Sequence, residues 1–169
     1  MSKQLWLLRH AKAARPANIS DIERPLSKKG KKDAELMGKW MAQQGLIPDC
    51  ILCSPAKRTM ATAKRINLTC NLASDIIFQD YRLYSENLDD LKTALAECKP
   101  QSDKVLIIGH NPSLENLLSW LLERPNTLAT RDYLHTATLA RISINSDWPG
   151  LSPHHAKLIS ITHIEECLI

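Results

Sequence analysis

Apolar residues along the chain fall into short continuous runs, separated by segments in which they recur at helical spacing. The continuous runs predict buried strands at residues 4–8, 50–53, 76–78, 105–108, 138–144 and 157–162. Apolar positions three to four residues apart predict helices over 27–44, 56–68, 88–98 and 112–122. Ser27, Asn87 and Asn111 are suitable caps for three of these helices. The alternation predicts an α/β protein, a three-layer α/β/α sandwich with a mostly parallel central sheet.

The last two predicted strands follow one another without a helix between them. The connection, residues 145–155, contains Pro149, Gly150 and Pro153, which are typical of turns. We therefore expect an antiparallel pair or a sheet edge at this end of the fold. No repeat, linker or large cap insertion interrupts the pattern, so residues 1–169 are predicted to form a single domain.

The composition is that of an ordinary globular protein. Hydrophobic residues make up 44% and charged residues 24% of the chain, and no run of about 18 apolar residues could span a bilayer. The first residues lead directly into an apolar strand and lack the features of a signal peptide. The five cysteines are an odd number without framework spacing, which favours reduced thiols. These observations predict a cytoplasmic protein without a membrane segment.

The formal net charge of +4 is modest. It suits an anionic substrate, although solvated helix faces would produce the same value. The basic run at residues 28–32 stands at the start of an amphipathic segment and has no aromatic residues interleaved with it. It is therefore interpreted as an exposed first helical turn, and we predict no nucleic-acid partner.

Polar side chains capable of chemistry follow three of the predicted strands. Arg9 and His10 end the first strand, His110 follows the strand at 105–108, and Arg58 lies in the first turn after the strand at 50–53. In a parallel sheet these ends share one edge, where helix N-termini also present unpaired N–H groups to anions. Guanidinium groups match phosphate oxygens, so this edge is predicted to bind a phosphoryl group. With no glycine-rich nucleotide loop and no acidic metal cluster, we predict no cofactor and no metal.

Four segments, in this order, resemble the signatures of the histidine phosphatase superfamily, whose fold is that of phosphoglycerate mutase. They are LRHAKA at residues 8–13, RPLSKKG at 24–30, SPAKRTMATA at 54–63 and GHNP at 109–112. The chain without a large cap insertion is most similar to the SixA branch, whose members remove phosphate from phosphohistidine in signalling proteins. Ala11 replaces the glycine that more commonly follows the first histidine, a change of one methyl group.

This resemblance implies a role for each matching residue. His10 would be the nucleophile that becomes phosphorylated in a covalent intermediate, and Arg9, Arg58 and His110 would bind the phosphoryl oxygens. Asn111 would help to shape the pocket, and Arg24 is a weaker binding candidate. The expected partner is a phosphorylated protein of the histidine-phosphotransfer type, which would place the enzyme in signal transduction. The oligomeric state is not predicted.

A general acid is the least well matched part of the site. Glu86 is the nearest candidate, although an acidic residue there also suits the start of a helix. Because phosphohistidine needs less acid assistance than an alkyl phosphate ester, a missing acid favours phosphohistidine as the substrate. Two alternatives remain open: a phosphomonoesterase for a small phosphorylated metabolite, which would use Glu86, and a non-catalytic phosphate-binding module.

Overall fold

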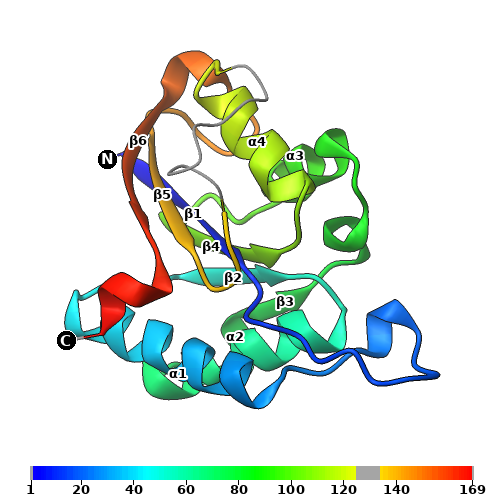
Figure 1. Cartoon of the computed structure of the whole chain (residues 1–169). Coiled ribbons are helices and arrows are strands. Elements are labelled where there is room, and N and C mark those ends of the chain that lie inside the picture. The colour runs from blue at the N-terminus through cyan, green and yellow to red at the C-terminus, as the bar shows by residue number, and fades with distance from the viewer. Residues whose placement is uncertain (1, 125–133, 169) are drawn as a thin grey trace.

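The computed structural model describes residues 2–124 and 134–168, whose centre is one six-stranded sheet (Figure 1). The strand order is β3-β2-β4-β1-β5-β6, and β3, β2, β4 and β1 are mutually parallel. β5 runs antiparallel to β1, and β6 antiparallel to β5, as the turn-rich connection predicts. The strands are β1 (Lys3–Arg9), β2 (Cys50–Cys53), β3 (Ile77–Gln79), β4 (Lys104–Gly109), β5 (Leu139–Ile144) and β6 (Ala156–Thr162).

Two helices cover each face of the sheet, so the predicted three-layer sandwich is confirmed (Figure 1). One outer layer contains α1 (Lys28–Gln43) and α2 (Lys57–Thr69), and the other contains α3 (Leu88–Ala96) and α4 (Ser113–Leu121). The observed ends of helices and strands lie within two residues of the predicted ones. Apolar spacing therefore located every one of these elements.

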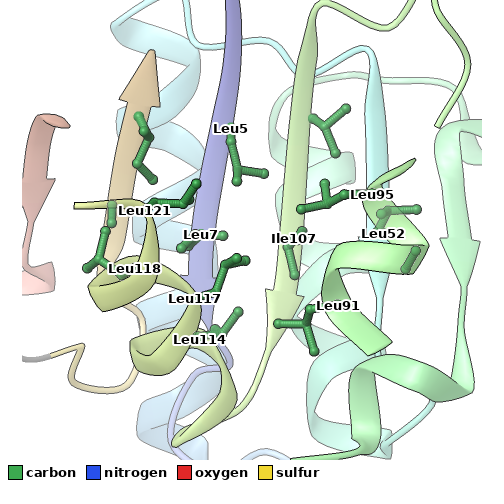
Figure 2. Packing of buried hydrophobic residues seen from close by; sticks show 14 of the residues in the cluster. Leu5, Leu7, Leu52, Leu91, Leu95, Ile107, Leu114, Leu117, Leu118 and Leu121 are labelled. Atoms are coloured by element: carbon green, nitrogen blue, oxygen red, sulfur yellow. The ribbon is translucent and has the colours of Figure 1, made fainter. Parts of the chain in front are cut away.

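Alternate residues of β1 pack into the two different cores. Leu5 and Leu7 contact the cluster beneath α3 and α4, as Figure 2 shows, whereas Trp6 and Leu8 belong to the cluster beneath α1 and α2. All four side chains are completely buried. A strand covered on both faces has to be apolar throughout, which explains the continuous run at the start of the chain.

The helix caps were predicted with mixed success. Ser27 accepts a hydrogen bond from the Gly30 N–H (3.0 Å), and Asn87 accepts one from the Asp89 N–H (2.9 Å), so both caps are confirmed. The prediction for Asn111 was wrong, because Pro112 occupies the cap position of α4. The Asn111 amide instead donates to the Glu115 carboxylate and to the Leu134 carbonyl, which direct it away from the helix N–H groups.

The parallel register brings three strand ends together. Arg9 is level with Gly109, and Cys53 with Ile108, so His10, Ser54 and His110 follow adjacent strands at one edge of the sheet. The loop of residues 11–26 lies at this edge (Figure 1). It is closed by a bridge between Ala13 and Leu26 and lies close to α1 at Gly30, where a side chain would overlap the Lys12 carbonyl.

The five cysteines are all free thiols. Cys50 and Cys53 point into opposite cores, as their spacing in a strand requires. Among the helices of the described residues, none is long and apolar enough to cross a bilayer.

Candidate active site

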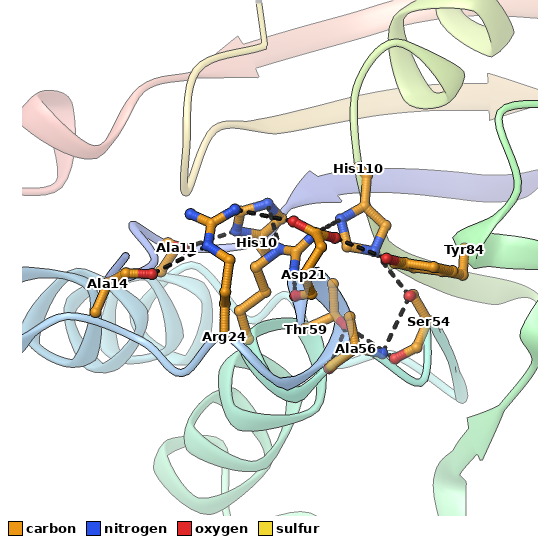
Figure 3. A network of polar contacts seen from close by, with 11 residues as sticks. His10, Ala11, Ala14, Asp21, Arg24, Ser54, Ala56, Thr59, Tyr84 and His110 are labelled. Atoms are coloured by element: carbon orange, nitrogen blue, oxygen red, sulfur yellow. Dashed lines mark hydrogen bonds and ion pairs between the residues drawn. The ribbon is translucent and has the colours of Figure 1, made fainter. Parts of the chain in front are cut away.

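His10 lies directly after β1 and is almost completely buried, with 8% of its surface exposed. Its Nδ1 lies 2.8 Å from the Ala11 carbonyl, and its Nε2 lies 3.3 Å from the Arg58 Nε (Figure 3). A carbonyl only accepts and a guanidinium only donates, so Nδ1 carries the proton and Nε2 presents a lone pair. Burial, together with the charges of Arg58 and Arg9, lowers the His10 pKa to about 4. The ring is therefore neutral near pH 7, with the lone pair of Nε2 available.

His110 follows β4 and faces His10, with 5.2 Å between the ring centroids. Its Nε2 lies 2.8 Å from the Ser54 Oγ, and its Nδ1 lies 3.3 Å from the Arg58 Nη2. By the same reasoning Nε2 carries the proton and donates to Ser54, which fixes the orientation of the ring. Burial, followed by the proximity of His10 and Arg58, lowers the His110 pKa to about 3.

Arg58 lies in the first turn of α2, and only 7% of its side chain is exposed. The guanidinium edge formed by Nε and Nη2 faces the two imidazoles. On the other edge, Nη1 donates to the Asp21 carbonyl (2.7 Å) and Nη2 to the Asp21 carboxylate (3.0 Å). Asp21 thus holds the outer edge of Arg58, while the inner edge is directed towards His10 and His110.

Arg9 adds a second guanidinium at the end of β1. Its Nη1 donates to the Leu134 carbonyl at 3.1 Å, and its Nε is buried without a hydrogen-bond partner among the described residues. A buried charged donor without an acceptor is unfavourable, and an oxyanion beside Arg9 would compensate for part of this cost.

The other three predicted residues surround this centre. Arg24 donates from Nε to the Ala14 carbonyl and from Nη1 to the Asp21 carboxylate, at 3.1 and 3.0 Å. Asn111 and the exposed Glu86 line a cavity of about 410 Å³ beside the histidines. Its full lining is Asp21, Arg58, Tyr84, Ser85, Glu86, His110, Asn111 and Ser113. The structure therefore brings all seven predicted side chains to one edge of the sheet.

Three side chains of the site were missed from the sequence. Ser54 stands at a strand end, like His10 and His110, so its position could have indicated it. Asp21 precedes Arg24 by three residues in the loop at this edge of the sheet, which indicates a site residue less clearly than the strand-end position of Ser54 does. Tyr84, whose hydroxyl donates to the Asp21 carboxylate at 2.7 Å and whose ring packs against His110, had no recognisable signal, because its contacts come from distant segments.

Two neutral imidazoles surrounded by arginines can bind and accept a phosphoryl group, since guanidinium groups stabilise the charge on its oxygens. Within residues 2–124 and 134–168, no three His, Cys, Asp or Glu side chains are arranged to hold a metal ion.

Comparison with known proteins agrees with this geometry. Residues 5–83 match the sequence model of the histidine phosphatase superfamily (branch 1). The structure of a putative phosphohistidine phosphatase SixA from Nakamurella multipartitia superimposes with a TM-score of 0.80 at 25% identity, over 96% of both chains. The chain is therefore similar to the histidine phosphatase superfamily in sequence over residues 5–83, and to a SixA structure in fold over nearly its whole length.

Two further proteins match nearly the whole chain. A structure of the protein histidine phosphatase SixA complexed with tungstate has a TM-score of 0.78 at 23% identity, and covers 95% of this chain and 97% of the other. An uncharacterised protein of Mycobacterium tuberculosis is 27% identical over 162 residues, which is 90% of this chain and 96% of the relative. The likeness is therefore not confined to the motifs around His10.

Proposed function

We propose that this protein is a histidine phosphatase that removes the phosphoryl group from phosphohistidine in a protein, through a covalent intermediate on His10. The observation that carries the proposal is the contact of the His10 Nε2 with the Arg58 Nε, which directs the lone pair of a neutral nucleophile to a guanidinium edge. The likeness to SixA structures supports the same activity. The substrate would be a cytoplasmic protein of the histidine-phosphotransfer type, in a signalling pathway.

The proposed reaction has two steps. In the first, the His10 Nε2 attacks phosphorus, and the bond from phosphorus to the leaving group breaks as the new P–N bond forms. The phosphoryl oxygens would lie beside His110 and against Arg9 and Arg58, whose N–H groups stabilise the charge that spreads over them. In the second step, water attacks the phosphorylated His10 and releases phosphate, which restores the free imidazole.

Phosphohistidine is favoured because the carboxylates near the centre are poorly suited to protonate a leaving oxygen. The hydrogen bond from Tyr84, followed by those from Arg24 and Arg58, holds the Asp21 pKa well below its usual range, so this group is ionised at neutral pH. Glu86 lines the cavity but is exposed to solvent. A phosphoramidate with a nitrogen leaving group needs less help from a protein acid than an alkyl ester does.

The test compares wild type with His10→Ala on a phosphohistidine protein and on a panel of small phosphate esters. Wild type is expected to hydrolyse phosphohistidine selectively and to form an acid-labile phosphoenzyme, and His10→Ala should lose both properties while remaining folded. His154→Ala, a change at an exposed histidine, serves as the matched control. Preference for one small ester would instead identify a metabolite phosphatase, and binding of phosphate without turnover a non-catalytic module.

A further inference from the structure

The 410 Å³ cavity lies on the side of the site where a leaving group would depart. Arg58 and His110 line it, whereas His10 is not among its lining residues, which suits a cavity that would hold the leaving group and not the attacking nitrogen. In-line transfer places the leaving group opposite the attacking nitrogen. The side chains of this cavity are therefore those that the leaving group would meet.

Two carboxylates line this cavity, Asp21 and Glu86, and Asp21 is the one that is hydrogen-bonded to Arg58. Its Oδ2 accepts from the Arg58 Nη2 (3.0 Å) and the Tyr84 hydroxyl (2.7 Å), and its Oδ1 accepts from the Arg24 Nη1 (3.0 Å). A carboxylate offers about four acceptor positions, and three are used by these side chains. Because 53% of the side chain is exposed, the remaining position on Oδ1 can be reached by a ligand.

A phosphorylated imidazole has a second ring nitrogen that decides how easily it leaves. If that nitrogen carries a proton, the electron pair of the breaking P–N bond returns to the ring and releases neutral imidazole. Without that proton, the product would be an imidazolate anion, which is a much poorer leaving group. The proton stays on the ring throughout, so no protein acid is consumed, and an N–H acceptor with a negative charge would stabilise the reactive form.

We infer that Asp21 accepts a hydrogen bond from the second ring nitrogen of the substrate and makes the site selective for N-phosphorylated imidazoles over phosphate esters. The inference rests on the proposed function and names the residue that recognises its leaving group. The inference also gives a role to the Asp21 carboxylate. An ionised carboxylate repels an anionic phosphoryl group, so its presence beside this site would otherwise be unfavourable.

The pH dependence of this interaction is set by the groups around Asp21. The charged or titratable side chains that face it are Arg24 from its own loop, Arg58 from α2, Tyr84 and Glu86 from the segment before α3, and His110 after β4. The carboxylate remains ionised over the whole neutral range, so the group that titrates is the substrate ring. Asp21 raises the pKa of that ring and extends activity towards higher pH.

The experiment measures kcat/KM for phosphoimidazole and for 4-nitrophenyl phosphate, whose leaving group needs no proton, in wild type, Asp21→Asn and Glu23→Gln. Asp21→Asn should lose about tenfold more activity on phosphoimidazole than on the nitrophenyl ester, the size expected for one charged hydrogen bond. In the pH profile of kcat/KM for Asp21→Asn on phosphoimidazole, the decrease in activity at alkaline pH should also begin at a lower pH than in wild type. Glu23→Gln removes the same charge from an exposed side chain of the same turn, and should change neither property.

Equal losses on both substrates, without a shift of the alkaline limb, would overturn the inference and leave Asp21 as a support for Arg58. Asp21→Ser provides a second variant if the asparagine protein is not folded. Failure of wild type to transfer a phosphoryl group from phosphoimidazole to His10 would reject the proposed function as well. If wild type transfers the phosphoryl group, but Asp21→Asn and Asp21→Ser keep the wild-type ratio of kcat/KM for the two substrates, the Asp21 inference alone is rejected.

Discussion

Arg58 is the side chain that contacts both histidines of the site and Asp21. One edge contacts His10 and His110, and the other edge is held by the Asp21 carbonyl and carboxylate. A planar fork with fixed donors can make both sets of contacts at once, whereas an ammonium group is a single point of charge. The chemistry of the site therefore depends on a guanidinium at this position and not merely on a positive charge.

Replacing Arg58 with lysine tests this dependence. Arg58→Lys should lower kcat/KM by about 10²-fold, because the donors that face the phosphoryl oxygens lose their geometry while the charge remains. Arg65→Lys is the matched control, since Arg65 lies on the same helix and contacts Glu35 away from the site. Steady-state kinetics measure kcat/KM for both variants. A decrease in kcat/KM of less than threefold for Arg58→Lys would show that the positive charge alone suffices.

Among individual residues of the site, the sequence could indicate those that lie at or just after the end of a strand. His10, His110 and Arg58 could be predicted because they follow apolar strands or begin the next helix. Asp21 was indicated only weakly, by its place in the loop, and Tyr84 could not be predicted, because their contacts join residues 37 and 63 positions apart in the chain. Local spacing contains no information about which surface loop folds over a given strand end.

The loop of residues 11–26 depends on α1 for its position. Ser27 caps α1 and also donates to the Lys12 carbonyl, and the Ser27 N–H donates to the same carbonyl at 2.9 Å. Gly30 allows this close approach, because a Cβ there would overlap the Lys12 backbone. The first turn of α1 and the loop that carries Asp21 and Arg24 are therefore one structural unit.

Gly30→Ala should move this loop while leaving the sheet intact. Because the overlapping atoms belong to backbone and cannot rotate away, we expect kcat/KM to fall on the order of 10- to 100-fold. Gly38→Ala is the control: its Cβ would meet Thr69 of α2, so it should reduce the thermal midpoint without a selective loss of activity per folded molecule. Full activity in folded Gly30→Ala protein would show that the loop tolerates displacement.

The elements themselves were predictable because each buries an apolar face. The cap of α4 was not, since a favourable residue type at Asn111 was outweighed by acceptors on Glu115 and Leu134. Leu134 is far from Asn111 in sequence, and its carbonyl also accepts from Arg9. Cap preference is thus a local rule that tertiary hydrogen bonds can override.

For the molecule as a whole, the buried neutral histidines make stability depend on pH. Folding lowers the His10 pKa from 6.5 to about 4 and the His110 pKa from 6.5 to about 3. Below pH 6.5 the unfolded chain therefore binds protons that the folded chain excludes. The free energy of unfolding should decrease as the pH falls from 7 towards 4, and this loss should level off only below the folded pKa values.

The contribution of His10 is on the order of 3 kcal/mol over this range, since each unit of pKa shift corresponds to about 1.4 kcal/mol. Urea unfolding at pH 7.0, 5.5 and 4.5 measures it. His10→Asn, which cannot titrate, should show a shallower decrease than wild type, while the exposed-site variant His154→Asn should follow wild type. Parallel curves for wild type and His10→Asn would contradict the burial of a neutral imidazole.

The central place of β1 has a consequence for the synthesis of the protein. This strand, which leads to His10, is translated long before its hydrogen-bonding partners, which are residues 104–109 on one side and 139–144 on the other. Such long-range pairing is slow to form and cannot begin until the later segments have been translated. A nascent chain therefore carries His10 long before it has a sheet to hold it, and the site around His10 can assemble only after residue 144 has been translated.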